Sequence, residues 1–330
     1  MRSAGYLKTQ AISGISMDIS NDHSAGAGFA ELHCLSNYSF LRGASHPEEL
    51  VETAARKGYQ AIALTDECTY SGLVKAHVAA KRHRIKLIVG AEFKTSFGTS
   101  INETLVVLAP NRSAYGQLAS FITKLRRRSE KGTYFAEIED FRLGLQECFI
   151  LWAPSLSSID LLIERGEQLK AIFSEFWIAL ELFHDGYDLD KTAHALTLSM
   201  HLNIEIVASN DVRMHSRNRQ PLKDLLKAIR KKTTVVALQK GVSQNAEHRF
   251  REIRELTTIY PIEAIQESLN IASRCSFSMD ELSYEYPKDL VPPHLSPTEY
   301  LKQLTWSGAK KRWPRGTPKG TQALIEKELK

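Results

Sequence analysis

The chain has 330 residues, of which 43% are hydrophobic and 25% are charged. This composition is typical of globular proteins, and no apolar run is long enough to cross a bilayer, so we expect no membrane partner. The length favours about two domains, and a net charge of +5 permits contact with nucleic acid without requiring it.

The N-terminal 28 residues are rich in Ser, Gly and Ala, and they lack the cationic start and apolar run of a secretory signal. We therefore expect residues 1–28 to form a mobile tail. The cysteines are widely scattered and contain no CxxC pair, which argues against a disulfide framework and a zinc knuckle. Their pattern favours a reducing, cytoplasmic location; they are Cys34, Cys68, Cys148 and Cys275.

Short β-rich runs alternate with helical stretches from residue 29 to about 213. The first helix is expected to begin after Ser45, whose hydroxyl would cap it, and to end at Lys57-Gly58. Two of the strands flank a polar turn at 95–99 and read as a hairpin. The predicted strands cover residues 30–35, 61–65, 87–93, 104–109, 149–152, 177–182 and 204–208.

This repetition of strand and helix predicts an α/β fold with a mostly parallel sheet. No glycine-rich phosphate loop follows the first strand, so a closed or nearly closed barrel is favoured over an open doubly wound sheet. The barrel is expected to span residues 29–235. A helix is predicted near the end of this region, at 222–232. A helical extension and linker would follow at 236–295. Residues 296–330, with Ser296 or Thr298 as a helix cap, read as the start of a further domain cut off at the end of the chain.

Polar side chains stand at the ends of several predicted strands. In a parallel barrel these ends converge on one face, where active sites are built. Any one of these side chains has the simpler role of capping a helix or holding a loop. Together they form the donor set that a cluster of divalent metals needs: His33, Asp66, Glu92, Glu181 and Asp211.

Five stretches of the chain resemble a known family. They are ELHCLSNYSFLRGASHPEEL at 31–50, ALTDEC at 63–68, GAEF at 90–93, NDVRMH at 210–215 and LTWSGA at 304–309. Together they are similar to the N-terminal PHP (polymerase and histidinol phosphatase) domain region of bacterial C-family DNA polymerases. The TDEC variant points to the error-prone, damage-inducible branch.

The resemblance implies a distorted seven-stranded βα barrel, a fold that agrees with the strand pattern. Intact members of the family hold two or three metals and hydrolyse phosphoesters. Residues at four of the ligand positions are kept: His33, Asp66, Glu92 and Asp211. At three others the family has histidine, whereas this chain has Glu31, Glu67 and Arg213.

The arginine is the most consequential of these changes. Glutamate oxygens can bind Mn²⁺, Mg²⁺ or Zn²⁺, but a guanidinium stays protonated and has no lone pair to donate. We expect Arg213 to pair with Asp211, Asp66 or Glu92 and to neutralise buried acids in place of a metal. No cofactor is therefore expected, with Mn, Zn or Mg as the alternative.

Three further residues are weaker ligand candidates. Glu181 lies in the sixth strand, and His184 follows it in a sequence that also reads as a turn. His215 is favoured as a surface or capping residue. Cys34 alternates with His33 along its strand, so it is expected to face the barrel wall as a core residue.

Four basic clusters could contact DNA phosphates, but we favour solvated helix faces because no aromatic residues are evident among them. They lie at 81–84, 124–128, 230–232 and 310–312.

Three functions remain open at this point. The chain is interpreted first as the N-terminal portion of an error-prone polymerase, with an inactive, structural PHP domain and the start of the polymerase core at 296–330. It would reach DNA, the downstream core and other translesion proteins as part of that enzyme. The alternatives are a metal-dependent phosphoesterase or 3′–5′ exonuclease, and a non-catalytic interaction module. We find no carboxylate cluster after the linker, so nucleotide addition by this chain alone is not expected.

Overall fold

The computed structural model describes residues 28–98, 102–238, 245–283 and 290–329. Residues 1–27 of the predicted tail therefore lie outside the described part. The chain divides into two compact units, residues 1–281 and 282–330, which are described separately below. Within the described residues no helix has the length and apolarity that crossing a membrane requires.

Seven strands form the frame of the first unit, in the order β1-β2-β3-β4-β6-β7-β8. All neighbours run parallel except β4, which is antiparallel to both β3 and β6. The strands are β1 (Ala30–Cys34), β2 (Ala61–Leu64), β3 (Lys86–Ser96), β4 (Asn102–Ala109), β6 (Phe149–Ala153), β7 (Phe176–Glu181) and β8 (Ile206–Ser209). A short strand that the sequence did not reveal, β5 (Ala136–Glu137), pairs with β3.

The two edges of this sheet nearly meet. The amide of Val212, just after β8, donates to the carbonyl of His33 at 2.9 Å, and the amide of Leu35 donates to the carbonyl of Val212 at 2.8 Å. These bonds link the first strand to the last and satisfy backbone groups that an open edge would expose. The predicted seven-stranded barrel and its β3–β4 hairpin are thus confirmed.

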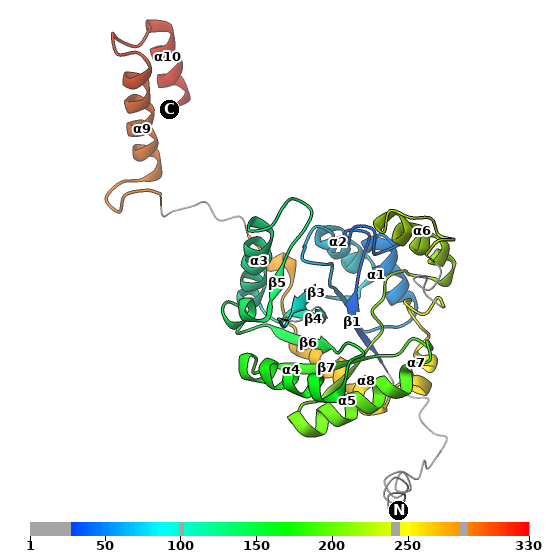
Figure 1. Cartoon of the computed structure of the whole chain (residues 1–330). Coiled ribbons are helices and arrows are strands. Elements are labelled where there is room, and N and C mark those ends of the chain that lie inside the picture. Colours follow the sequence, from blue (N-terminus) through cyan, green and yellow to red (C-terminus); the bar gives the residue numbers. More distant parts are fainter. Residues whose placement is uncertain (1–27, 99–101, 239–244, 284–289, 330) are drawn as a thin grey trace, which may run out of the picture. The chain divides into compact units, whose positions relative to one another are not determined.

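Helices cover the outside of the ring of strands (Figure 1). The apolar faces of α1 to α5 pack on the outward side chains of the strands, and Cys34 belongs to this outer core, as predicted. The helices are α1 (Pro47–Arg56), α2 (Leu73–His83), α3 (Arg112–Arg127), α4 (Ile159–Ile172), α5 (Asp188–Leu202), α6 (Gln220–Arg230), α7 (Ile253–Ile259) and α8 (Ile262–Arg274).

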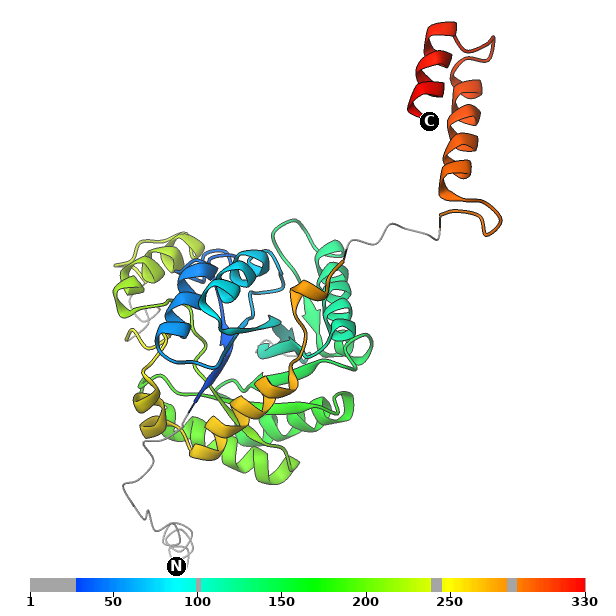
Figure 2. The same cartoon turned by 180° about the vertical axis from the view of Figure 1, so that it is seen from behind.

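A second, inner core fills the barrel, and α8 closes it. Ile271 and Ala272 of α8 pack with inward residues from the starts of the strands, such as Ala30 and Trp177. The Trp177 indole also donates to Glu267 of α8 at 2.7 Å. Figure 2 shows α8 lying across the strands. Because α8 seals the N-terminal ends of the strands, their C-terminal ends are left to form a site.

The start of α1 differs from the prediction. Its cap is His46, whose backbone is extended and whose amide donates to Glu49 Oε2 at 2.8 Å. Ser45 lies one residue too early, and its hydroxyl accepts from the amide of His215 at 2.9 Å instead. The predicted end of the helix is correct, since Lys57 is the C-cap and Gly58 has a φ of 77°.

The second unit contains α9 (Pro297–Arg312) and α10 (Lys319–Glu328). Ser296 caps α9, because its hydroxyl accepts from the amide of Glu299 at 3.3 Å and the Glu299 carboxylate accepts from the Ser296 amide at 2.9 Å. Ala309 is the one hydrophobic residue of the described part of this unit that is buried. The first unit includes α7 and α8 and extends to residue 281. The functional boundaries at 235/236 and 295/296 stay predictions.

The loop between β1 and α1 folds back tightly on itself. A Cβ added to Gly43 would lie 2.0 Å from the carbonyl oxygen of Ser36. Backbone stands at both sides of this contact, so neither partner can move aside easily. Only glycine fits, and the close approach fixes the shape of the loop at 36–43.

We expect Gly43→Ala to lower the free energy of unfolding by about 2 kcal/mol or more, because overpacking against backbone forces the loop apart. Urea denaturation followed by circular dichroism measures this. The matched control is Gly116→Ala in α3, where the new methyl group meets nothing within 4 Å and should stabilise the helix by up to about 1 kcal/mol. Equal midpoints for Gly43→Ala and the unchanged protein would contradict the close packing.

Candidate functional site

Three buried side chains with metal-ligating atoms meet at the C-terminal end of the barrel. They are His33 of β1, Glu92 of β3 and Asp211 just after β8, and one ligand atom from each lies within 4.8 Å of the others. The C-terminal ends of parallel strands converge here. The structure therefore brings together three of the four residues that match the family's ligand positions.

His33 lies between two carboxylates. Its Nε2 donates to Glu92 Oε2 at 2.9 Å and its Nδ1 to Glu181 Oε1 at 2.7 Å. Burial lowers the pKa of His33, but the charges of Glu181 and Asp211 outweigh it and raise that pKa to about 10. Since both ring nitrogens face acceptors, the ring is an imidazolium at neutral pH. Glu181, a weaker candidate on sequence grounds, is thus a direct partner in the site.

Arg42 is the residue that the sequence analysis missed. It comes from the loop after β1, and its two terminal nitrogens donate to the two oxygens of Glu92 at 2.5 and 3.1 Å. Its Nη1 is also 2.7 Å from Glu67 Oε2. Burial alone would raise the pKa of Glu92, but the charges of Arg42 and Lys94 hold that pKa well below its ordinary value. Arginine in a polar loop gives no sequence signal of such a contact.

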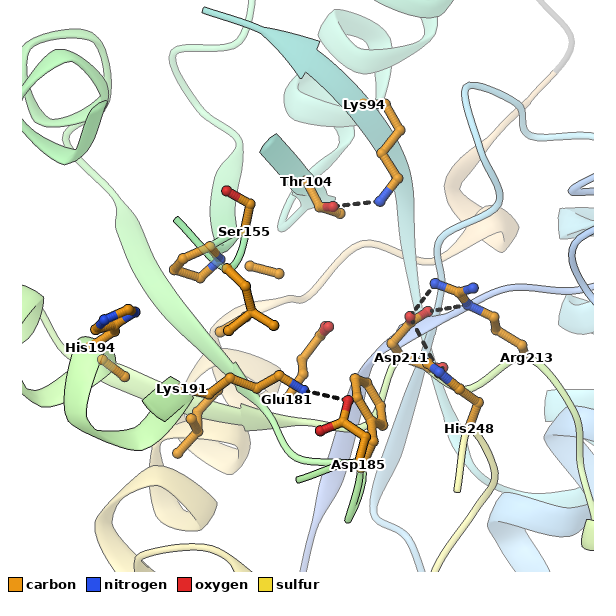
Figure 3. A pocket seen from close by; sticks show the side chains of 17 residues that line it. Lys94, Thr104, Ser155, Glu181, Asp185, Lys191, His194, Asp211, Arg213 and His248 are labelled. Atoms are coloured by element: carbon orange, nitrogen blue, oxygen red, sulfur yellow. Dashed lines mark hydrogen bonds and ion pairs between the residues drawn. The ribbon is translucent and has the colours of Figure 1, made fainter. Parts of the chain in front are cut away.

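Arg213 makes the second guanidinium–carboxylate pair of the site (Figure 3). Its Nε is 3.0 Å from Asp211 Oδ1, and its Nη2 contacts Oδ2 of the same carboxylate. Of the three acids proposed as its partners, Arg213 thus pairs with Asp211. His248, also missed, has its Nδ1 at 3.4 Å from Asp211 Oδ2. Burial and the charge of Arg213 lower the pKa of His248 to about 4, so this ring is neutral at physiological pH.

Asp66 stands at its predicted strand end but outside the cluster. Its two oxygens accept from the amides and hydroxyls of Ser36 and Ser39, at distances of 2.6 to 3.1 Å. Burial raises the pKa of Asp66, although these hydrogen bonds oppose the shift. Asp66 therefore fixes the loop after β1, the simpler role that such a residue can have.

Glu31 and Glu67 also point to other partners. Glu31 accepts from the side-chain nitrogen of Asn210 at 2.7 Å and from the amide of His33 at 3.1 Å. The register of β1 shifts between Glu31 and Cys34, so Glu31 and His33 do not share a face as a regular strand would require. Burial raises the pKa of Glu31 to about 7. Glu67 binds Arg42 and accepts from the Tyr134 hydroxyl at 3.1 Å.

The two weaker histidine candidates lie away from the cluster. His184 is 56% exposed, sits in a turn with a φ of 52°, and has its Nδ1 3.8 Å from Asp188. The Nδ1 of His215 is 2.8 Å from the Ser45 hydroxyl. Neither is available as a ligand in this arrangement.

The donor set does not fit a cluster of two or three metals. The site pairs three carboxylates with three cations: Glu92 with Arg42, Asp211 with Arg213, and Glu181 with His33. A metal ion here would have to displace fixed guanidinium groups and the proton of His33. A cavity of about 310 Å³ opens on the site, and Lys94 and Lys191 are among its lining residues (Figure 3).

Comparison with known proteins agrees with the barrel fold. Residues 31–241 match the PHP domain family. The chain is 46% identical over 310 residues to "Error-prone DNA polymerase" of Methylococcus capsulatus, which covers 93% of this chain and 29% of that protein. It is 44% identical over 316 residues to the protein of the same name from Idiomarina loihiensis, covering 95% and 30%.

Among solved structures, an amidohydrolase from Chromobacterium violaceum superposes with a TM-score of 0.47 at 16% identity, over 57% of this chain and 88% of that one. The chain spans 29% and 30% of the length of the two polymerases. Because the family match covers more than half of the 330 residues, the chain belongs to the PHP domain family.

Proposed function

We propose that this chain serves as the PHP-domain portion of an error-prone DNA polymerase that copies damaged DNA, and that its barrel is a metal-free scaffold instead of a hydrolase. The observation that carries the second part is the set of ion pairs at the C-terminal end of the barrel. Each of the three side chains able to share a metal already contacts a group of opposite charge. The similarity to proteins named error-prone DNA polymerase supports the first part.

The free energies favour the ion pairs over a metal. His33, whose pKa is raised to about 10 by Glu181 and Asp211, carries its proton at pH 7, and a metal ion would have to displace that proton. Leaving Arg42 or Arg213 unpaired in the same buried site adds a further cost. In the proposed scaffold these ion pairs neutralise the acids without a cofactor.

In this proposal the rest of the polymerase, and not this chain, carries out nucleotide addition. Across the described ranges, the cluster of His33, Glu92 and Asp211 is the one group of three or more metal-ligating side chains that lie close together. A polymerase core, DNA and other translesion proteins are the partners that this assignment implies. The barrel would brace that core.

A metal-dependent phosphoesterase or 3′–5′ exonuclease is the second candidate. The observation that favours it is the convergence of His33, Glu92 and Asp211 within 4.8 Å, which is close enough to hold one ion. This function needs the proton on His33 and both guanidinium groups to leave when the ion binds.

We expect the purified chain to bind well under one Mn²⁺ or Zn²⁺ per molecule and to release no phosphate from a phosphoester substrate. Arg213→His should raise Zn²⁺ affinity by at least about ten-fold, because it removes a cation from Asp211 and supplies a ligand nitrogen. Isothermal titration and elemental analysis measure both effects.

The matched control is Arg219→His, because Arg219 is paired with Glu49 outside the cluster and its replacement should leave metal affinity unchanged. One equivalent of Mn²⁺ in the unchanged chain, lost in Asp211→Asn together with phosphoesterase activity, would establish the second candidate instead.

We expect both ring nitrogens of His33 to carry protons at pH 8, visible as two N–H correlations in ¹⁵N-histidine NMR spectra. The ring of His248 should be singly protonated under the same conditions. A singly protonated His33 ring at pH 8 would show that its carboxylate partners do not hold the charge.

This proton should also make stability depend on pH. The folded pKa of His33, about 10, lies above the unfolded value near 6.5, so its contribution is complete below pH 6.5 and is lost as the pH rises through 10. The difference in unfolding free energy between the unchanged protein and His33→Gln should fall by about 1.4 kcal/mol per pH unit between pH 7 and 10. Comparing the two proteins cancels Lys223, whose burial lowers its pKa to about 7 and gives the opposite trend.

A further inference from the structure

A second and larger cavity adjoins the ion-pair site. Its volume is about 680 Å³, and its walls come from the loop after β1, from β3, from residues 132–136 and from the end of α6. Lys94 lines both this cavity and the one that opens on the ion-pair site. The three side chains that could share a metal, His33, Glu92 and Asp211, do not line the larger cavity.

Phe40 is held in water at one wall of this cavity. Its side chain is 81% exposed, although its neighbours Ser39 and Arg42 are 1% and 7% exposed. Ser39 is anchored to Asp66 and Arg42 to Glu92, and Leu41 between Phe40 and Arg42 adopts a left-handed φ of 60°. A non-glycine residue in this conformation costs about 1 kcal/mol or more. The anchored residues on both sides of Phe40 thus hold its ring in solvent at a fixed place.

A second exposed aromatic ring lines the same cavity. Phe135 is 54% exposed and belongs to the segment 132–136. Tyr134 beside it is tied into the structure, since its hydroxyl donates to Glu67 and the Arg126 guanidinium covers its ring at 5.4 Å. Tyr38, a further ring in the wall, is half-buried, and Lys75 lies over it at 5.9 Å. Phe40 and Phe135 are the exposed rings of the wall, and they come from segments far apart in the chain. Because the two rings are distant in sequence from one another, they do not appear as aromatic residues interleaved with a basic cluster.

The wall of this cavity is positively charged. Two cations of the wall, Arg126 and Arg230, have no carboxylate partner in the described ranges, whereas Lys94 lies 3.6 Å from Glu92. The one carboxylate of the wall, Glu67, is paired with Arg42. Arg126 donates to three carbonyl oxygens, so its charge is not cancelled and two of its five N–H groups remain. Arg230, at the end of α6, is exposed and has no carboxylate partner in the described ranges. The smaller cavity differs, because three carboxylates balance its three cations.

We propose that this cavity binds single-stranded DNA, with bases stacked on Phe40 and Phe135 and phosphates held by Arg126 and Arg230. Exposed aromatic rings beside cations that have no carboxylate partner are the combination that such strands need. Unpaired bases are required, because the faces of paired bases are already stacked in a duplex. The choice of DNA as the ligand rests on the proposed function.

The test measures binding of a fluorescein-labelled oligo(dT) 16-mer to the 330-residue chain by fluorescence anisotropy in 50 mM salt. We expect Phe40→Ala and Phe135→Ala each to weaken binding by about ten-fold, because each removes one stacking surface. The logarithm of affinity should fall with the logarithm of salt concentration with a slope of about −1.4, as two phosphate contacts predict, and Arg230→Ala should reduce the size of that slope by about 0.7.

Two matched controls separate this site from general surface effects. Tyr187→Ala removes an aromatic ring that is 50% exposed and lies outside the cavity. Arg82→Ala removes an exposed arginine from the last turn of α2, also outside it. Both should bind the oligonucleotide like the unchanged chain. Thermal melting should show that all variants are folded, since every replaced side chain is largely exposed.

Three results would overturn the proposal: no binding of oligo(dT) by the unchanged chain, equal losses in the controls and the cavity variants, or tighter binding of a duplex of the same length. If Phe40 and Phe135 instead form a docking site for a partner protein, the unchanged chain should not bind oligo(dT). The metal measurements are independent of this test. A failure to bind DNA would therefore not contradict the metal-free scaffold, and stoichiometric metal binding would not contradict DNA binding by this cavity.

Discussion

The arrangement of the whole site depends on the ion pair between Arg42 and Glu92. Glu92 is fully buried, and a buried carboxylate is tolerated only when a charge or several donors compensate it. Arg42 supplies both, and to do so it must come from a loop that folds over the end of the barrel. The tight turn at Gly43, the serine anchors on Asp66 and the outward position of Phe40 are all consequences of bringing this guanidinium to Glu92.

The fold could be predicted from the sequence because periodicity and strand ends are local signals. The seven strands, their hairpin and the convergence of His33, Glu92 and Asp211 all follow from such signals. The partners of the other acids could not be predicted in this way. A register shift in β1 separates Glu31 from His33, and Ser36 and Ser39 take Asp66. Arg42 and His248 join the site through loops, whose paths depend on tertiary packing that no periodicity encodes.

In the proposed metal-free scaffold, fixed cations change what the barrel depends on. A metal cluster ties the folded state to the supply of the ion, since binding free energy is then folding free energy. Guanidinium groups are encoded in the chain and remain charged at every physiological pH. The carboxylates of the site therefore keep a structural use, because they hold the loop after β1 and the segment after β8 against the barrel.

Closure of the barrel has a consequence for its synthesis. The first strand is bonded to the segment around Val212, and α8 seals the inner core only when residues 262–274 exist. Until then β1 has an unpaired edge and the inner apolar faces lack their cover, the condition in which nascent chains aggregate. Such distant pairing also slows folding. The chain thus emerges N-terminal end first, but the barrel can be completed only after most of its first unit has left the ribosome.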